Sequence, residues 1–177
     1  MENIAVFCGS QNGVQPQYLL AATAVGTYLG QQGKHLIYGG GNSGLMGAVA
    51  NAALVSGATV TGIIPTFLNS VERQHQGLTT LVVTETMHER KQHLFAAADA
   101  AIILPGGFGT LDELFELLTW NQLNLHQIKV IIYDVHNFYG NLLQHIEYMK
   151  QQGFLYDNPN TLIAYVTTVD ELHKLLQ

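Results

Sequence analysis

Short apolar segments alternate along this chain with longer helix-like segments, and in one of these Leu111, Leu114, Phe115 and Leu118 recur at helical spacing. The short segments are almost continuously apolar, which is typical of parallel strands covered on both faces. They predict strands over Ile4–Cys8, His35–Tyr38, Thr59–Ile64, Thr80–Thr84, Ala100–Leu104, Val130–Tyr133 and Leu162–Val166. The longer segments predict helices over Gln17–Gln32, Leu45–Ser56, Met87–Ala98, Leu111–Leu123, Tyr139–Gln152 and Val169–Leu176. This alternation predicts an α/β fold, a doubly wound, mostly parallel sheet of about seven strands with helices on both faces.

The length of 177 residues fits one domain, and we assign residues 1–177 to it. No long linker, internal repeat or low-complexity tract divides the chain. The segment Pro65–Gly77 is the least regular stretch, and we expect it to form a mobile loop.

Charged residues are scarce, at 11% of the chain, and seven Lys and Arg stand against thirteen Asp and Glu. A net charge of −6 argues against nucleic-acid binding, which depends on neutralising phosphates. No apolar run reaches the roughly 18 residues that a membrane span needs. The first residues lack a basic stretch, and a single cysteine forms no internal disulfide, so we expect a cytoplasmic protein. The low charge also suggests that a second copy of the chain covers part of the surface.

Glycines gather where the predicted strands end. Ligands of doubly wound sheets bind beyond the carboxyl ends of the strands, and four such ends read CGSQNG, YGGGNSGLMG, GIIP and LPGGFGT. The chain has 18 glycines, about 10% of its residues against a usual 7% or so. Their position indicates that backbone approaches a ligand at this edge of the sheet.

The first long glycine loop contains G-x-G-x-x-G at Gly39, Gly41 and Gly44. Dinucleotide binding also calls for an acidic residue at the end of the next strand, which here ends in Ile64-Pro65. The missing acid argues against NAD. Two interpretations stay open: a tight turn that lets a helix pack on the sheet, or the lining of a mononucleotide site.

The second loop, Pro105–Thr110, predicts a phosphate site. Its three glycines let the backbone curl, and Thr110 is placed to begin a helix at Leu111, whose free N–H groups would bind an anion. Because no Gly-Lys-Ser/Thr follows, we expect a monophosphate rather than a triphosphate.

Glu113 has two interpretations. Thr110-x-x-Glu113 is a capping box, in which the carboxylate only satisfies the Thr110 N–H. Alternatively, the crowding of Asp112, Glu113 and Glu116 beside a predicted anion site indicates that one of these acids acts on the ligand.

Arg90 and Lys91 are adjacent and form either a solvated basic pair or a contact with phosphate and ribose. His88 and His93 lie five residues apart, off a common helical face, so we expect no metal site. Cys8 ends a strand, and we interpret it as a packing residue rather than a nucleophile.

The segments VFCGS, YGGGNSGLMG, MHERK, LPGGFGTLDEL and TWNQLNLH, in this order, resemble the LOG ("Lonely Guy") family of cytokinin riboside 5′-monophosphate phosphoribohydrolases. The resemblance implies a Rossmann-like fold, a homodimer, no metal or cofactor, and hydrolysis of the N-glycosidic bond of a nucleoside 5′-monophosphate. It implies a catalytic pair, Arg90 and Glu113. The substrate-binding residues it implies are Ser10, Gly40, Gly41, Glu72, Met87, Lys91, Gly106, Gly107, Phe108, Gly109, Thr110, Asp112 and Thr119.

Two positions depart from the family pattern. Gln11 replaces a second serine after CGS, and Asp112 replaces a glutamate before Glu113. The preferred base therefore stays open between an N6-modified adenine and an ordinary purine or pyrimidine. A non-catalytic carrier of a phosphorylated ligand, like the molybdenum-cofactor carriers, is the further alternative.

Overall fold

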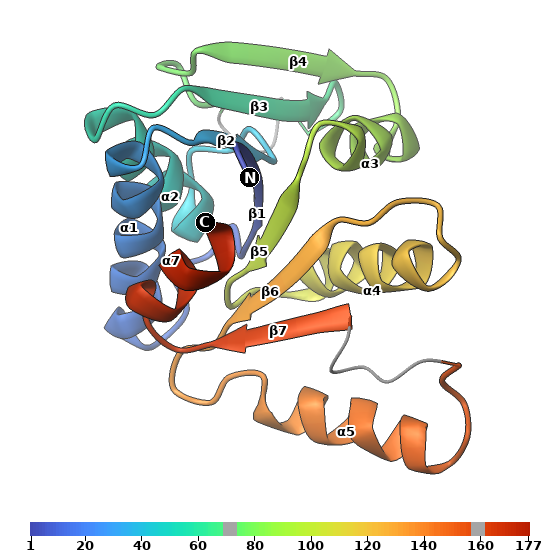
Figure 1. Cartoon of the computed structure of the whole chain (residues 1–177). Helices are drawn as coiled ribbons and strands as arrows, with labels where there is room; N and C mark the ends of the chain where they lie inside the picture. Colours follow the sequence, from blue (N-terminus) through green and yellow to red (C-terminus); the bar gives the residue numbers. More distant parts are fainter. Residues whose placement is uncertain (69–73, 157–161) are drawn as a thin grey trace.

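The computed structural model, which describes residues 1–68, 74–156 and 162–177, is built on one seven-stranded sheet. All neighbouring strands pair in parallel, in the order β4-β3-β2-β1-β5-β6-β7 (Figure 1). Their bounds are β1 Asn3–Phe7, β2 His35–Tyr38, β3 Val60–Pro65, β4 Thr80–Thr84, β5 Ala100–Ile103, β6 Lys129–Tyr133 and β7 Ile163–Val166. All seven predicted strands are confirmed, and the Rossmann-like α/β fold with them.

Helices cover both faces of this sheet. The helices are α1 Pro16–Gln31, α2 Gly44–Val55, α3 Met87–Ala96, α4 Phe108–Gln122, α5 Gly140–Gln151 and α7 Val169–Leu176. In Figure 1, α1, α2 and α7 lie on one side of the strands, and α3 and α4 lie on the other. None of the helices in the described ranges is long and apolar enough to cross a membrane.

Two apolar cores follow from this layering, because successive strand residues point to opposite faces. On β1, Ile4 and Val6 join the core beneath α1, α2 and α7, whereas Ala5 and Phe7 join the core beneath α3 and α4. A strand buried on both faces needs apolar residues at every position, which explains its continuous apolar sequence.

The strand order reverses between β1 and β5. Phe7 pairs with Ile103, and just beyond, the Gly9 N–H donates to the Pro105 carbonyl at 3.0 Å. The chain leaves β1 and β5 toward opposite faces of the sheet, and residues of both loops line a cavity between them. The CGS loop and the PGGFGT loop therefore meet at the carboxyl edge of the sheet.

Helix α4 begins at Phe108, three residues before the predicted start at Leu111. Gly107 is the N-cap, in an extended conformation, and the Gly107 carbonyl accepts from the Leu111 N–H at 3.1 Å. Thr110 thus lies inside the first turn, and its side chain fills the space that a Cβ on Gly106 would occupy. The prediction that Thr110 begins the helix is wrong, since glycine serves as an N-cap without a side-chain oxygen.

Candidate active site

Arg90 projects from the first turn of α3 and lies across the carboxyl ends of β2 and β3. The Thr86 side chain caps this helix by accepting from the Glu89 N–H, which fixes where Arg90 emerges. Arg90 Nε donates to the Ile63 carbonyl at 3.0 Å, and Nη2 donates to the Gly39 carbonyl at 3.3 Å. The residue is only 7% exposed. Arg90 is therefore a fixed, buried cation, and the solvated-pair interpretation is wrong for it.

Gly39 makes room for this guanidinium. A Cβ built on Gly39 would collide with Arg90 Nη2 and lie 3.2 Å from the Met46 sulfur. Arg90 lies between this glycine and Met87, whose sulfur is 3.9 Å from Nη1. The glycine after β2 is thus required by the arginine that lies against it.

We expect Gly39→Ala to displace the Arg90 side chain and to lower kcat of the reaction that the sequence resemblance implies by about tenfold to a hundredfold, since a misplacement of about 1 Å can have that effect. A comparison of kcat values, with circular dichroism to confirm folding, measures this. Gly33→Ala is the matched control, because no atom lies within 4 Å of a Cβ there and only its positive φ is strained. Equal kcat losses in both variants would contradict the steric role of Gly39.

Glu113 faces Arg90 from α4. Its Oε1 lies 4.0 Å from Arg90 Nη1, and the residue is 9% exposed. Burial raises the pKa of Glu113 to about 7, the positive charge of Arg90 opposes this rise, and the negative charge of Asp112 adds to it. The capping-box interpretation is wrong, because Gly107 is the N-cap and Glu113 lies in the second turn.

Cys8 directly follows β1 and packs in the apolar core beneath α1, α2 and α7. It is buried, and burial together with the negative charge of Glu113 raises the pKa of its thiol well above the usual range. A thiol that stays protonated is a poor nucleophile. The packing interpretation of Cys8 is confirmed.

The start of α4 presents backbone amides next to the CGS loop. Gly107, Phe108 and Gly109 are exposed, and the amides of a first helical turn have no carbonyl within the helix to bind. A cavity of about 260 Å³ is lined by both loops, including Ser10, Gly106 and Gly107, and extends to Tyr18 and Phe138. The structure therefore brings Ser10 and the PGGFGT loop together at the predicted anion site.

Lys91 forms ion pairs with the other two acidic residues of α4, Asp112 and Glu116. Its Nζ lies 3.1 Å from Asp112 Oδ2 and also pairs with Glu116. Partial burial works against the charged form, but hydrogen bonds to Glu116 and Asp112 outweigh it and raise the pKa of Lys91. The crowding of acids thus has a structural explanation for Asp112 and Glu116, and Glu113 alone faces Arg90.

The remaining predicted binding residues lie in two places, the turn after β2 and the outer face of α4. Gly40 and Gly41 are buried in the turn that continues from Gly39. Thr119 is exposed, and its hydroxyl donates to the Phe115 carbonyl at 2.7 Å. Phe108, Asp112, Lys91 and Thr119 line an open groove of about 550 Å³ on the outer face of α4. Glu72 lies outside the described residues.

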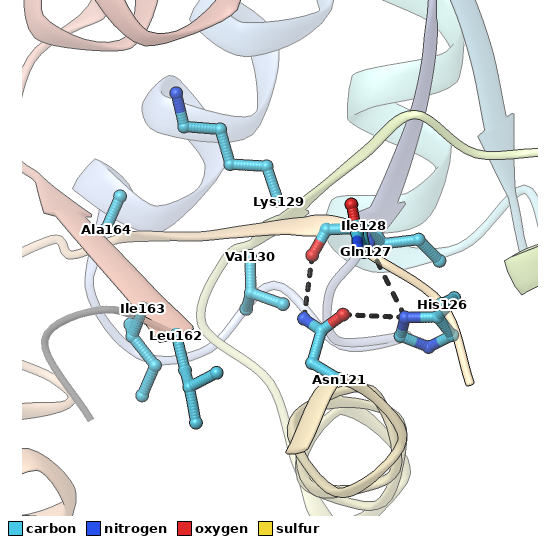
Figure 2. A pocket seen from close by; sticks show the side chains of 9 residues that line it. All are labelled: Asn121, His126, Gln127, Ile128, Lys129, Val130, Leu162, Ile163 and Ala164. Carbon is cyan, nitrogen blue, oxygen red and sulfur yellow. Dashed lines mark hydrogen bonds between the residues drawn. The ribbon is translucent and has the colours of Figure 1, made fainter. Parts of the chain in front are cut away.

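Another hollow, of about 440 Å³, lies by the amino ends of β6 and β7, away from the Arg90–Glu113 pair and the glycine loops (Figure 2). Asn121 connects residues that line this hollow. Its amide donates to the Ile128 carbonyl at 2.8 Å, and its Oδ1 lies 2.7 Å from His126 Nδ1. Lys129 Nζ donates to the Leu175 carbonyl. These contacts join α4, β6 and α7, and we regard the hollow as structural. Within the described ranges, no three His, Cys, Asp or Glu side chains lie close enough to hold a metal ion.

Comparison with known proteins decides the family. A family model described as "Possible lysine decarboxylase" matches residues 46–176. A cytokinin riboside 5′-monophosphate phosphoribohydrolase of Rhodococcoides fascians is 41% identical over 87% of this chain and 78% of its own length. The enzyme of the same name, LOG7, of Arabidopsis thaliana is 38% identical over 99% of this chain and 81% of its own length. The chain belongs to the LOG family. The resemblance found in the sequence is confirmed.

The LOG fold is shared more widely than the LOG sequence. The molybdenum cofactor carrier protein of Chlamydomonas reinhardtii superposes with a TM-score of 0.75 over 99% of this chain and 95% of its own, at 15% identity. That likeness concerns the fold alone. The LOG family match includes both α3 with Arg90 and α4 with Glu113.

Proposed function

We propose that this protein hydrolyses the N-glycosidic bond of N6-modified adenosine 5′-monophosphates and releases the free base and ribose 5-phosphate. The observation that carries the proposal is the buried Arg90–Glu113 pair beside the start of α4. The names of the relatives, which are phosphoribohydrolases at 38% and 41% identity, support this choice of substrate.

In the proposed mechanism the 5′-phosphate binds the backbone amides of Gly107, Phe108, Gly109 and Thr110, where the positive end of the α4 dipole favours an anion. Ser10, Gly106 and the Gly40–Gly41 turn line the nucleotide beside them. This arrangement directs the anomeric carbon toward Glu113, one turn further along the helix.

Cleavage breaks the bond between C1′ and the base nitrogen, and the base leaves with the electron pair and takes up a proton. The sugar becomes oxocarbenium-like, and the ionised Glu113 carboxylate stabilises this positive charge. Water then adds to C1′, and Glu113 accepts its proton. Arg90 orients the sugar hydroxyls and keeps Glu113 ionised near neutral pH, a role distinct from the second acid of glycosidases.

The pH profile follows from the raised pKa of Glu113. We expect kcat/KM to rise with pH through about 7 and to fall about tenfold per unit below it, because only the ionised carboxylate acts. Initial rates between pH 5 and 9, with folding checked by circular dichroism, measure this. An activity that stays constant down to pH 5 would contradict Glu113 as the group that must be ionised.

The direct test is incubation of the purified protein with isopentenyladenosine monophosphate, AMP, GMP and CMP, followed by chromatography for free base. We expect base release, fastest with the isopentenylated substrate. Similar kcat/KM values for all four would favour a general nucleotide nucleosidase. Binding of AMP without release of base would favour a carrier and overturn the proposal.

We further propose that residues 1–177 act as one domain, in a cytoplasmic homodimer that binds small molecules rather than nucleic acid or membrane. Exposed apolar residues on and after α4 support a covered surface there: Phe108 is 93% exposed, Leu123 60% and Leu125 66%. Light scattering at micromolar concentration tests the dimer, and a monomeric mass would refute it.

A further inference from the structure

His75 is buried beside the Gly39–Gly41 turn, which contacts Arg90, although His75 belongs to no sequence motif. It is 6% exposed, and both ring nitrogens are within hydrogen-bond distance of a partner. The Gly77 N–H donates to Nδ1 at 3.0 Å, and Nε2 lies 3.1 Å from Asn51 Oδ1 on α2.

These partners define the protonation state of the ring. Asn51 Nδ2 donates to the Gly47 carbonyl at 2.8 Å, so Asn51 Oδ1 is the acceptor and His75 Nε2 carries the hydrogen. Since Nδ1 accepts from Gly77, the ring is neutral and has a single tautomer. Burial also lowers the pKa of His75, which favours the same neutral form.

The backbone around His75 is joined to the turn that follows β2. The His75 N–H donates to the Gly40 carbonyl at 3.2 Å, and Gln74 pairs with Gly41 in an antiparallel bridge. Gly40 has a φ of +79°, a left-handed conformation that external contacts help to hold. The turn Gly39–Gly41 is thus bound to α2 through the His75 ring.

The same turn supports Arg90. The Gly39 carbonyl accepts from Arg90 Nη2, and the absence of a Cβ on Gly39 leaves the space in which Nη2 lies. A shift of the turn would therefore move one of the two backbone acceptors that orient the guanidinium. The other, Ile63, belongs to β3 and is fixed by the sheet.

We propose that His75 is a positioning residue for the reaction: it clamps the Gly39–Gly41 turn to α2 and thereby holds Arg90 at its distance from Glu113. This inference rests on the proposed function, since it gives a purpose to the placement of Arg90. Asn51 acts with His75 by orienting the ring.

We expect His75→Ala to lower kcat for base release by about tenfold, because the Gly39 carbonyl of the turn orients Arg90. The change in KM should be less than about threefold, because the turn only lines the nucleotide, whose phosphate binds at the start of α4. We also expect the Arg90 Nε–H signal in a ¹H–¹⁵N NMR spectrum to shift or broaden, as its guanidinium gains freedom. His75→Gln, which keeps a donor near the Nε2 position, should restore kcat to within about threefold of the wild type.

His35→Ala is the matched control. His35 also bonds through both ring nitrogens, to Thr59 Oγ1 at 2.6 Å and Thr61 Oγ1 at 3.0 Å, but it lies at the amino end of β2. Its loss should lower the melting temperature while leaving kcat and the Arg90 signal unchanged. A purely structural role for His75 would give the same result in both alanine variants and would overturn the inference.

Two further outcomes are decisive. If His75→Ala does not fold, His75→Gln is measured in its place. A correctly folded His75→Gln variant with a kcat below a tenth of wild type and an unchanged Arg90 signal would overturn the inference. If the wild type releases no base, the proposed function fails. The Arg90 signal still tests the clamp in that case, because it is measured without substrate.

Discussion

Replacement of Glu113 by glutamine is expected to lower kcat for base release by about a thousandfold or more, with the fold intact. The amide keeps the size and the burial of the side chain but carries no negative charge to stabilise an oxocarbenium-like sugar and accepts no proton from water. Loss of one well-placed electrostatic group has an effect of about this size in other enzymes. Single-turnover base release, which separates chemistry from product release, is the measurement.

The same replacement is expected to stabilise the protein at pH 8. The folded-state pKa of Glu113 is about 7, above its ordinary value of 4.5, so the folded chain binds this proton more tightly than the unfolded chain does. Stability from this group is therefore full below about 4.5, is lost as pH rises through about 7, and is absent at pH 8. We expect Glu113→Gln to raise the free energy of unfolding by about 1–3 kcal/mol at pH 8 and by much less at pH 5.

Glu116→Gln, the same change one turn further along α4, is the matched control. Glu116 pairs with Lys91 rather than with Arg90. Its replacement should leave kcat within about threefold of the wild type. If Glu113→Gln kept more than a tenth of wild-type kcat, or lost stability at pH 8, the assignment of the buried carboxylate would be wrong.

Replacement of Arg90 by lysine is expected to lower kcat by about a hundredfold or more, although the positive charge is kept. One ammonium group cannot occupy the positions of Nε, Nη1 and Nη2, which contact Ile63, Glu113 and Gly39. Loss of this planar geometry leaves a buried backbone acceptor unsatisfied and lets the charge move. Steady-state kinetics of the folded variant measures the effect.

The charge of Arg90 has a separate readout in Arg90→Met. Burial raises the pKa of Glu113, and the positive charge of Arg90 opposes that rise. Removal of Arg90 should therefore raise the pKa of Glu113 further and move the acid limb of the pH profile above 7. Lys129→Met is the control, since Lys129 donates to Leu175 away from the site and should leave the profile unchanged. An acid limb that does not move in Arg90→Met would show that another group titrates there.

The strands and most helices could be predicted because the polarity of their residues follows whether each position is buried or exposed. Buried parallel strands must be apolar on both faces, so the continuous apolar run Ala100–Ile103 is recognisable as a strand from its sequence. Proline and glycine follow soon after it, where the backbone turns. The start of α4 was missed because Gly107, as an N-cap, carries no side chain that signals its role, whereas Thr110 does.

For the site, local spacing was ambiguous in a way that only long-range contacts resolve. Thr110-x-x-Glu113 and Thr168-x-x-Glu171 have the same spacing, yet only the second forms a capping box. The contribution of His75 was missed for the same reason. Its partners Asn51 and Gly40 lie far from it in sequence, and no spacing rule connects them.

The sequence by itself determined the layered α/β fold, the glycine-rich edge and the LOG resemblance, since these depend on side-chain polarity and on motifs within single segments. The tertiary structure decided which acid faces Arg90 and which pairs with Lys91, because α3 and α4 are brought together only when both pack on the same face of the sheet. It also decided the raised pKa of Glu113, because exclusion of water from a carboxylate is a property of the packed molecule and not of any one segment.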